Sequence, residues 1–156
     1  DEEELVMGGY WSAYWHNGYI YGTEIARGLD VFELAPSDYL SENELAAASL
    51  LSSGGIVNVQ TQSRLEWPAE PVVARAYLDQ LQRSNVIDAG LAAALNDALA
   101  QADSALQSGN SSADAAQQLT NLAASFASAA DDSTGATQRR YDGLADTLEG
   151  IAARLQ

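Results

Sequence analysis

Hydrophobic side chains recur at steps of three and four residues through the second half of the chain, the spacing of one helix face. Segments 72–83 and 88–108 show this periodicity, and a third segment begins near Ser112. Gly109 follows the second segment as a C-cap. The side chains expected to face inward are Val73, Ala74, Tyr77, Leu78 and Leu81; Leu91, Leu95, Leu99, Ala102 and Leu106; Ala115, Leu119, Leu122, Phe126 and Ala129; and Tyr141, Leu144, Leu148, Ile151 and Leu155. Short polar turns separate the segments, so the pattern predicts an Ala-rich, up-down antiparallel helical bundle over 72–156.

The first 35 residues follow a strand pattern instead. Seven of the twelve aromatic residues lie there, and aromatic side chains favour strands. Asn17-Gly18 is a strong signal for a two-residue hairpin turn, and a second turn is expected at Arg27-Gly28. With this register, the expected cross-strand neighbours are His16 and Tyr19, Trp15 and Ile20, Tyr14 and Tyr21, and Trp11 and Glu24. We therefore predict three short antiparallel strands, an aromatic β-meander, over 1–35.

The stretch 36–71 connects the two patterns. Ser41 and Glu44 form a capping-box sequence that opens a short helix reaching about Leu51, and Gly54-Gly55 ends it. Alternating polar and β-branched residues over 56–65 favour an extended segment or strand. The stretch 67–71 contains two prolines and is expected to be a rigid connector, with its second proline in the first turn of the next helix. The chain is thus predicted to be an α+β protein, a meander followed by a helical bundle.

Large rings on both faces of so small a sheet indicate that something covers them. Exposed apolar surface and free strand edges are typical of interfaces. We therefore expect the sheet to contact a partner through Tyr10, Trp11, Tyr14, Trp15, Tyr19 and Tyr21. Two alternatives remain open at this point: a strand from outside this sequence covers the meander, or the segment 56–65 does. Self-association into a homo-oligomer is open as well.

The charge of the chain narrows the classes of partner. Twenty-two acidic residues stand against seven basic ones, which gives a formal net charge of −15. Nucleic-acid binding requires clustered Lys and Arg, and docking on an anionic membrane surface requires them too, so neither partner is expected. No apolar run reaches the roughly 20 residues of a membrane span, so membrane insertion is not expected either. The acidic start, Asp1 to Glu4, is unlike the basic start of a signal peptide.

Residues that would carry chemistry are sparse. The chain has no Cys and a single histidine, His16, which we interpret as a structural residue at a strand end. Neither Asp1 to Glu4 nor the stretch 131–135 has the alternating spacing of a calcium loop, so a solvated segment and an interhelical loop are expected there. Glu24 and Arg27 are expected to pair across a turn. We predict no catalytic residues, no metal, no cofactor and no enzymatic activity.

The stretch from Gly8 to Leu34, GGYWSAYWHNGYIYGTEIARGLDVFEL, resembles the final blade of bacterial LVIVD-repeat β-propeller proteins. The helix start at Ser41 and the Trp67-Pro68 connector resemble the C-terminal extension of the same group. The resemblance implies a secreted or surface-exposed bacterial protein whose other blades are not in this sequence. It also implies that Asp30 is the aspartate of the repeat, holding a turn through backbone hydrogen bonds. The sequence departs from the pattern because a blade has four strands and only three are predicted.

Two functional readings follow from this resemblance and from the composition. The first is a non-catalytic structural or protein-interaction module, whose partner is another protein chain or the missing propeller blades. The alternative is the non-catalytic C-terminal part of a larger extracellular propeller enzyme or ligand-binding protein, or an accessory subunit of a surface complex.

Overall fold

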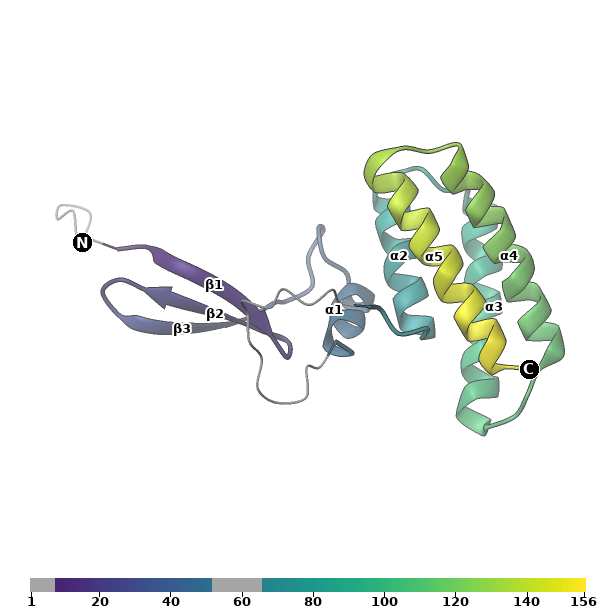
Figure 1. The fold of residues 1–156 in the computed structure, drawn as a ribbon, viewed down its shortest axis with the longest axis horizontal. Helices are drawn as coiled ribbons and strands as arrows, with labels where there is room; N and C mark the ends of the chain where they lie inside the picture. Colours follow the sequence, from purple (N-terminus) through teal and green to yellow (C-terminus); the bar gives the residue numbers. More distant parts are fainter. Residues whose placement is uncertain (1–7, 52–65) are drawn as a thin grey trace.

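The computed structural model describes residues 8–51 and 66–156, which form one three-stranded sheet and five helices (Figure 1). This arrangement confirms the predicted α+β class. The expected strand at 56–65, the helix end at Gly54-Gly55 and the stretch Asp1 to Glu4 lie outside the described residues. The elements are β1 (Tyr10–His16), β2 (Tyr19–Glu24), β3 (Gly28–Glu33), α1 (Glu42–Ser49), α2 (Pro71–Arg83), α3 (Ala89–Ser108), α4 (Ala113–Asp131) and α5 (Gly135–Arg154).

The sheet is an antiparallel meander in the order β1-β2-β3. Asn17 and Gly18 occupy the first turn with φ values of 49° and 90°, as a type I′ turn requires. The structure confirms three of the expected cross-strand pairs, His16 with Tyr19, Trp15 with Ile20, and Tyr14 with Tyr21. The sequence-derived register therefore holds through the half of the hairpin nearest the turn.

The expected pairing of Trp11 with Glu24 is wrong. Tyr10 lies opposite Glu24, and the register shifts between Tyr10 and Ser12. Trp11 is the extra residue of this β-bulge, in which two residues of one strand oppose one of its neighbour. The bulge moves Tyr10 to the face of the sheet that carries Gly22 and Phe32, where its ring packs.

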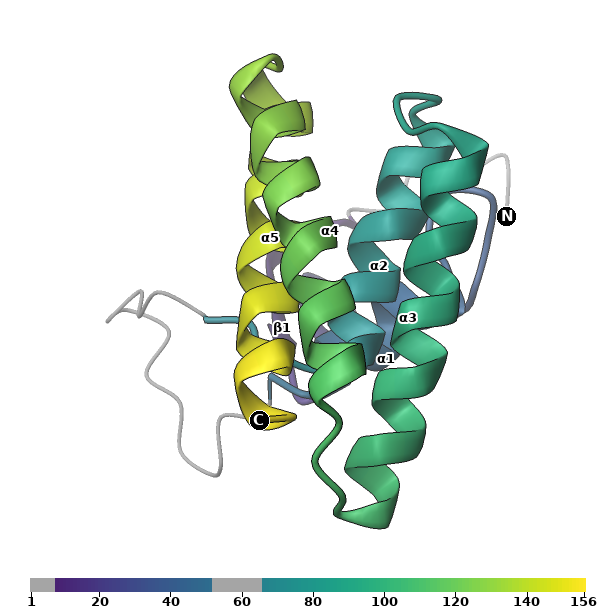
Figure 2. The same cartoon turned by 90° about the vertical axis from the view of Figure 1, so that its right-hand side faces the viewer.

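Helices α2 to α5 form the bundle, and consecutive helices run antiparallel to each other (Figures 1 and 2). Figure 2 shows α4 and α5 side by side, with α2 and α3 beside them. Ten large side chains are almost completely buried between these helices: Leu78, Leu81, Leu95, Leu99, Leu119, Phe126, Leu144, Leu148, Ile151 and Leu155. Most of the expected inward-facing residues therefore do form the core.

The expected stripe on α4 differs from the observed one. Leu122 and Ala129 are only half-buried, whereas Ala123 and Ala130 are buried. Both stripes have a helical period, so periodicity alone does not decide between them. The observed stripe consists mostly of buried Ala side chains, and α4 and α5 have the most extensive contact of any two described helices. Small side chains allow the two helices to approach closely.

Local signals fix the helix ends. Ser41 accepts a hydrogen bond from the Glu44 N–H at 3.1 Å, and the Glu44 side chain accepts one from the Ser41 N–H at 2.7 Å, so the predicted capping box is present. Gly109 ends α3 in the left-handed conformation with φ of 66°. Among the described residues, no helix combines the length and the hydrophobicity that crossing a bilayer requires.

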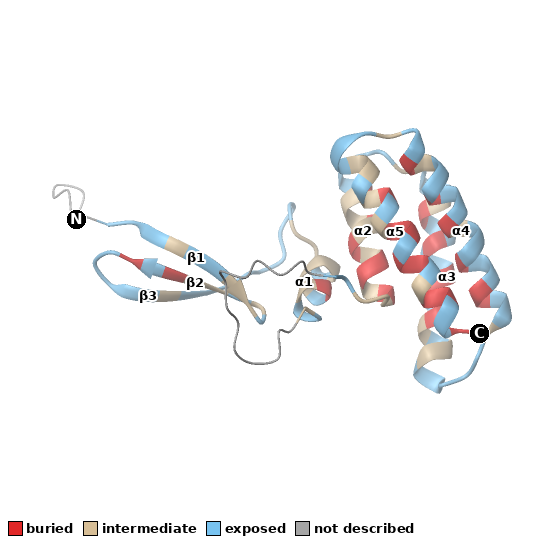
Figure 3. Cartoon of the chain, viewed as in Figure 1, coloured by how far each residue is buried: buried red, intermediate tan, exposed pale blue. Residues whose placement is uncertain are grey.

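Helix α1 packs on α2 and not on the sheet. Ala47 forms a small second core with Val73 and Ala76, and the Arg83 guanidinium pairs with the Glu44 carboxylate. In the described part of the chain, none of the three strands packs extensively on any helix. The sheet therefore extends away from the bundle (Figure 1), and Figure 3 shows that β3 is mostly exposed whereas β2 has buried and half-buried positions.

Candidate functional site

The structure places all six predicted partner-binding residues on the sheet. Tyr10, Trp11, Tyr14 and Trp15 belong to β1, and Tyr19 and Tyr21 belong to β2. Trp15 and Tyr21 are half-buried and the other four are exposed, with Trp11 at 76 % of its full accessible area. Within the strands only Gly22 and Glu24 are buried, so the sheet has no apolar core of its own.

A polar network holds the three strands together at the end near the Arg27 turn. The Tyr10 hydroxyl donates to Asp30 Oδ2 at 2.6 Å, and the Arg27 guanidinium donates to the same oxygen at 2.8 Å. The hydrogen bond from Tyr10, followed by the one from Arg27, lowers the pKa of Asp30. The Tyr10 ring also meets the Phe32 ring edge-on, with 5.8 Å between centroids. Tyr10 therefore links β1 to β3 across the central strand.

Glu24 organises the turn between β2 and β3. Its carboxylate accepts hydrogen bonds from the N–H groups of Gly9 at 3.0 Å, Ala26 at 2.7 Å and Arg27 at 2.5 Å. The bond from Gly9, with those from Arg27 and Ala26, lowers the pKa of Glu24 despite its burial. A carboxylate with three backbone donors is held in its charged form.

One expectation about this turn needs correction, and another is confirmed. The resemblance assigned the backbone hydrogen bonds of a turn to Asp30, but Glu24 makes them, and Asp30 accepts from two side chains. The expected pair of Glu24 and Arg27 is present, with 4.0 Å between Arg27 Nε and Glu24 Oε2. The shorter ion pair of Arg27 is the one with Asp30, because the guanidinium extends along the turn toward β3.

His16 lies at the end of β1, as expected, and its ring centroid is 6.4 Å from that of Tyr21. Asp131 is the last residue of α4 and Asp132 is its C-cap, and both are exposed. Across residues 8–51 and 66–156, no three His, Cys, Asp or Glu side chains are grouped so that they would hold a metal ion.

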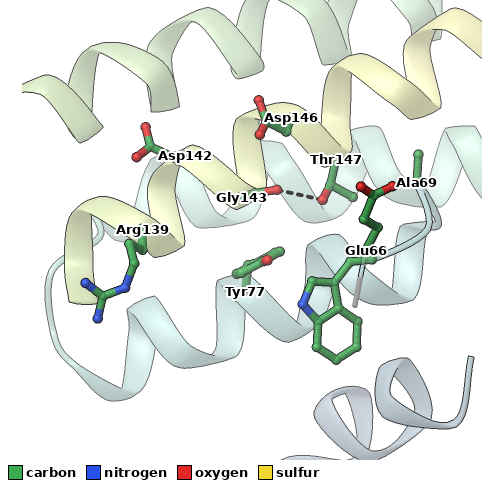
Figure 4. A pocket seen from close by; sticks show the side chains of 9 residues that line it. Glu66, Ala69, Tyr77, Arg139, Asp142, Gly143, Asp146 and Thr147 are labelled. Atoms are coloured by element: carbon green, nitrogen blue, oxygen red, sulfur yellow. Dashed lines mark hydrogen bonds between the residues drawn. The ribbon is translucent and has the colours of Figure 1, made fainter. Parts of the chain in front are cut away.

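A pocket of about 570 Å³ lies where α2, α5 and the connector before α2 meet (Figure 4). The rings of Trp67 and Tyr77 line it together with an excess of acidic side chains over basic ones. The charged lining residues are Glu66, Asp142, Asp146 and Arg139. Burial, and then the charge of Asp146, raise the pKa of the Tyr77 hydroxyl. The lining thus places negative charge beside aromatic surface, an arrangement that disfavours anionic ligands.

Sequence reasoning did not find this pocket, although a signal for it exists. Gly143 and Gly150 lie in the interior of α5, where glycine costs about 1 kcal/mol relative to alanine. A Cβ on Gly143 would lie 2.5 Å from the Tyr77 hydroxyl oxygen, and one on Gly150 would lie 2.5 Å from Ala69 Cβ. The two glycines make room for side chains that pack onto α5 from α2 and from the connector.

Comparison with protein-family models, with curated proteins and with solved structures finds no match to this chain. The resemblance to the LVIVD-repeat propellers therefore stays a prediction that rests on the residues of the meander and the connector.

Proposed function

We propose that this chain is a non-catalytic protein-interaction module of a secreted or surface-exposed bacterial protein, and that the sheet is its docking element. The observation that supports this most directly is a sheet with rings on both faces and, among residues 8–51 and 66–156, no core beneath either face. A three-stranded sheet usually needs an apolar face covered by another layer, and the described helices do not supply one. The bacterial and extracellular setting comes from the LVIVD resemblance alone.

The energy available from covering the sheet is large. A Trp or Tyr side chain buries roughly 150–250 Å² in a core or interface. Trp11 keeps 76 % of its area exposed, so covering it would remove on the order of 150 Å² from water. At about 25 cal/mol per Å², that area corresponds to roughly 4 kcal/mol before the costs of association. Trp and Tyr are also the residue types enriched in binding hot spots.

The test replaces Trp11 and Trp15 with Ser in the natural protein and measures assembly by light scattering and co-purification. We expect at least a tenfold loss of association, because truncating a hot spot costs 2 kcal/mol or more. The matched control is Tyr39→Ser, since Tyr39 is 85 % exposed but lies outside the sheet. Helical circular dichroism should stay nearly unchanged in both variants. Normal assembly of the Trp11/Trp15 variant would refute the docking role of the sheet.

The alternative is that the chain is the non-catalytic C-terminal part of a larger propeller enzyme or ligand-binding protein, whose other segments would supply a missing fourth strand. The sheet has three strands, whereas a propeller blade has four. The same incompleteness suits an accessory subunit of a surface complex. Mass spectrometry of the natural protein separates these readings. Peptides that extend upstream of Asp1 in one polypeptide support the larger protein, and a processed amino terminus at Asp1 supports a separate module.

A further inference from the structure

The two edges of the sheet differ in how well they are suited to pair with another strand. In the order β1-β2-β3, the outer backbone edge of β1 and that of β3 both lack a neighbouring strand among the described residues. The β1 edge is broken by the bulge between Tyr10 and Ser12, and bulges disrupt the ladder locally and twist a strand away from pairing. β3 pairs with β2 at every position from Gly28 to Glu33 without irregularity. The outer edge of β3 is therefore more regular than that of β1 and better suited to pair with another strand.

β3 also lacks several of the features that usually protect an edge strand. Natural proteins protect such edges with Lys, Pro, a bulge or a covering helix. The sequence Gly-Leu-Asp-Val-Phe-Glu contains neither Lys nor Pro, and no described helix packs on it. Leu29 and Val31 are 60 % and 53 % exposed. Such an edge pairs readily with an extended segment, so it is either a hazard or a binding site.

The charge along β3 indicates the chemistry of the partner. Asp30 and Glu33 are its charged residues, and Asp30 is paired with Arg27. Glu33 is exposed at the end of the strand, where a partner strand would bring its own side chains close. Charge complementarity between partners fixes register and excludes competitors. A partner with Lys or Arg near Glu33 fits this edge.

We propose that the β3 edge accepts an extended, basic segment of a separate polypeptide, which pairs with it as a fourth strand. The proposal rests on the docking function proposed above and adds to the ring-bearing faces a second contact, at the β3 edge, with a partner of stated chemistry. A six-residue edge sets the segment at about six residues, roughly 20 Å long. A second copy of this chain does not fit, because each copy carries a net charge of −15 and would bring its own Asp30 and Glu33 to the contact.

The probe is an end-capped eight-residue peptide of alternating Val and Thr that carries two Lys, added to the ¹⁵N-labelled 156-residue chain. We expect amide shifts along Gly28–Glu33 and none along Tyr10–His16. A peptide with Glu in place of Lys should bind at least about threefold more weakly. A peptide with alternate backbone nitrogens methylated should not bind, because it cannot complete the ladder.

A charge reversal on the edge adds the decisive comparison. Glu33→Lys should weaken binding of the Lys peptide by about two- to tenfold. This is the change expected when an exposed ion pair is replaced by a repulsion between two positive charges. The control Asp97→Lys makes the same change of net charge on the exposed surface of α3 and should leave affinity unaltered. Unchanged amide dispersion of the strands verifies that both variants are folded.

Three results overturn the proposal: no amide shifts along β3, shifts along β1 instead, or equal effects of Glu33→Lys and Asp97→Lys. These failures are separable from failure of the docking function. If the Trp11/Trp15 variant loses assembly but the peptides cause no amide shifts along β3, the sheet docks through its faces. Only the edge proposal is then refuted. If that variant assembles normally, the docking function is refuted, whether or not the peptides bind to β3.

Discussion

Truncation of Leu148 tests the bundle core directly. Leu148 lies in α5 and has no exposed surface, within the cluster that also holds Leu144 and Ile151. Replacing it with Ala removes three carbon groups, which at about 0.8 kcal/mol each amounts to roughly 2.4 kcal/mol of lost burial. The cavity left behind adds to this, because neighbouring helices collapse only partly. We expect Leu148→Ala to lower the free energy of unfolding by about 3–4 kcal/mol.

Leu122→Ala is the matched comparison, because it removes the same atoms from a half-buried position on α4. Its expected cost is about 1 kcal/mol, since much of the side chain already faces water and no closed cavity forms. Urea unfolding followed by circular dichroism at 222 nm measures both values by linear extrapolation. Equal losses for the two variants, or a loss below 1 kcal/mol for Leu148→Ala, would refute the packing described for α4 and α5.

Three further outcomes are expected. Gly143→Ala should lower the free energy of unfolding by about 1–2 kcal/mol in urea, because its Cβ would meet the Tyr77 ring. In a Tyr77→Ala background the same change should raise that free energy, because only the gain in helix propensity of about 1 kcal/mol remains. Because the pKa of Glu24 is lowered in the folded state, its carboxylate stabilises the fold at pH values above the ordinary carboxyl pKa of about 4.5. This contribution is lost as the pH falls below that value toward the lowered pKa, and the hydrogen bonds to Glu24 should open. Amide exchange at Gly9 and Ala26 reports this opening, and Glu24→Gln should remove its pH dependence. Melting temperatures in EDTA and in excess Ca²⁺ should agree, and a shift above about 5 °C would establish a specific ion site.

The helical half is predictable from sequence because its signals are local. Gly109 adopts a left-handed conformation that other residues resist, and Ser41 and Glu44 cap each other within one helical turn. Such signals act over three or four residues and need no knowledge of the rest of the fold. The inward stripe of α4 was harder, because the choice between Leu122 and Ala123 depends on how closely α5 approaches.

The features that sequence reasoning missed depend on contacts between distant residues. The bulge at Trp11 produces no break in the strand pattern, and it becomes understandable only when Tyr10 is seen against Gly22 and Asp30. Because side chains alternate along a strand, one extra residue moves every residue before it to the opposite face. The pocket on α5 likewise depends on Gly143 and Tyr77, which meet through the packing of two separate helices.

The bulge also explains how a sheet without an apolar core keeps its register. By turning Tyr10 toward Asp30 and Phe32, it assembles the polar network at the Arg27 turn, where Glu24 is buried as well. Toward the opposite end, the rings of Tyr14 and Tyr19 are exposed. The network therefore orders the strands at the Arg27 end of the sheet, and the exposed rings of Tyr14 and Tyr19 are accessible for contact. A binding surface that is ordered before its partner arrives costs less entropy to dock.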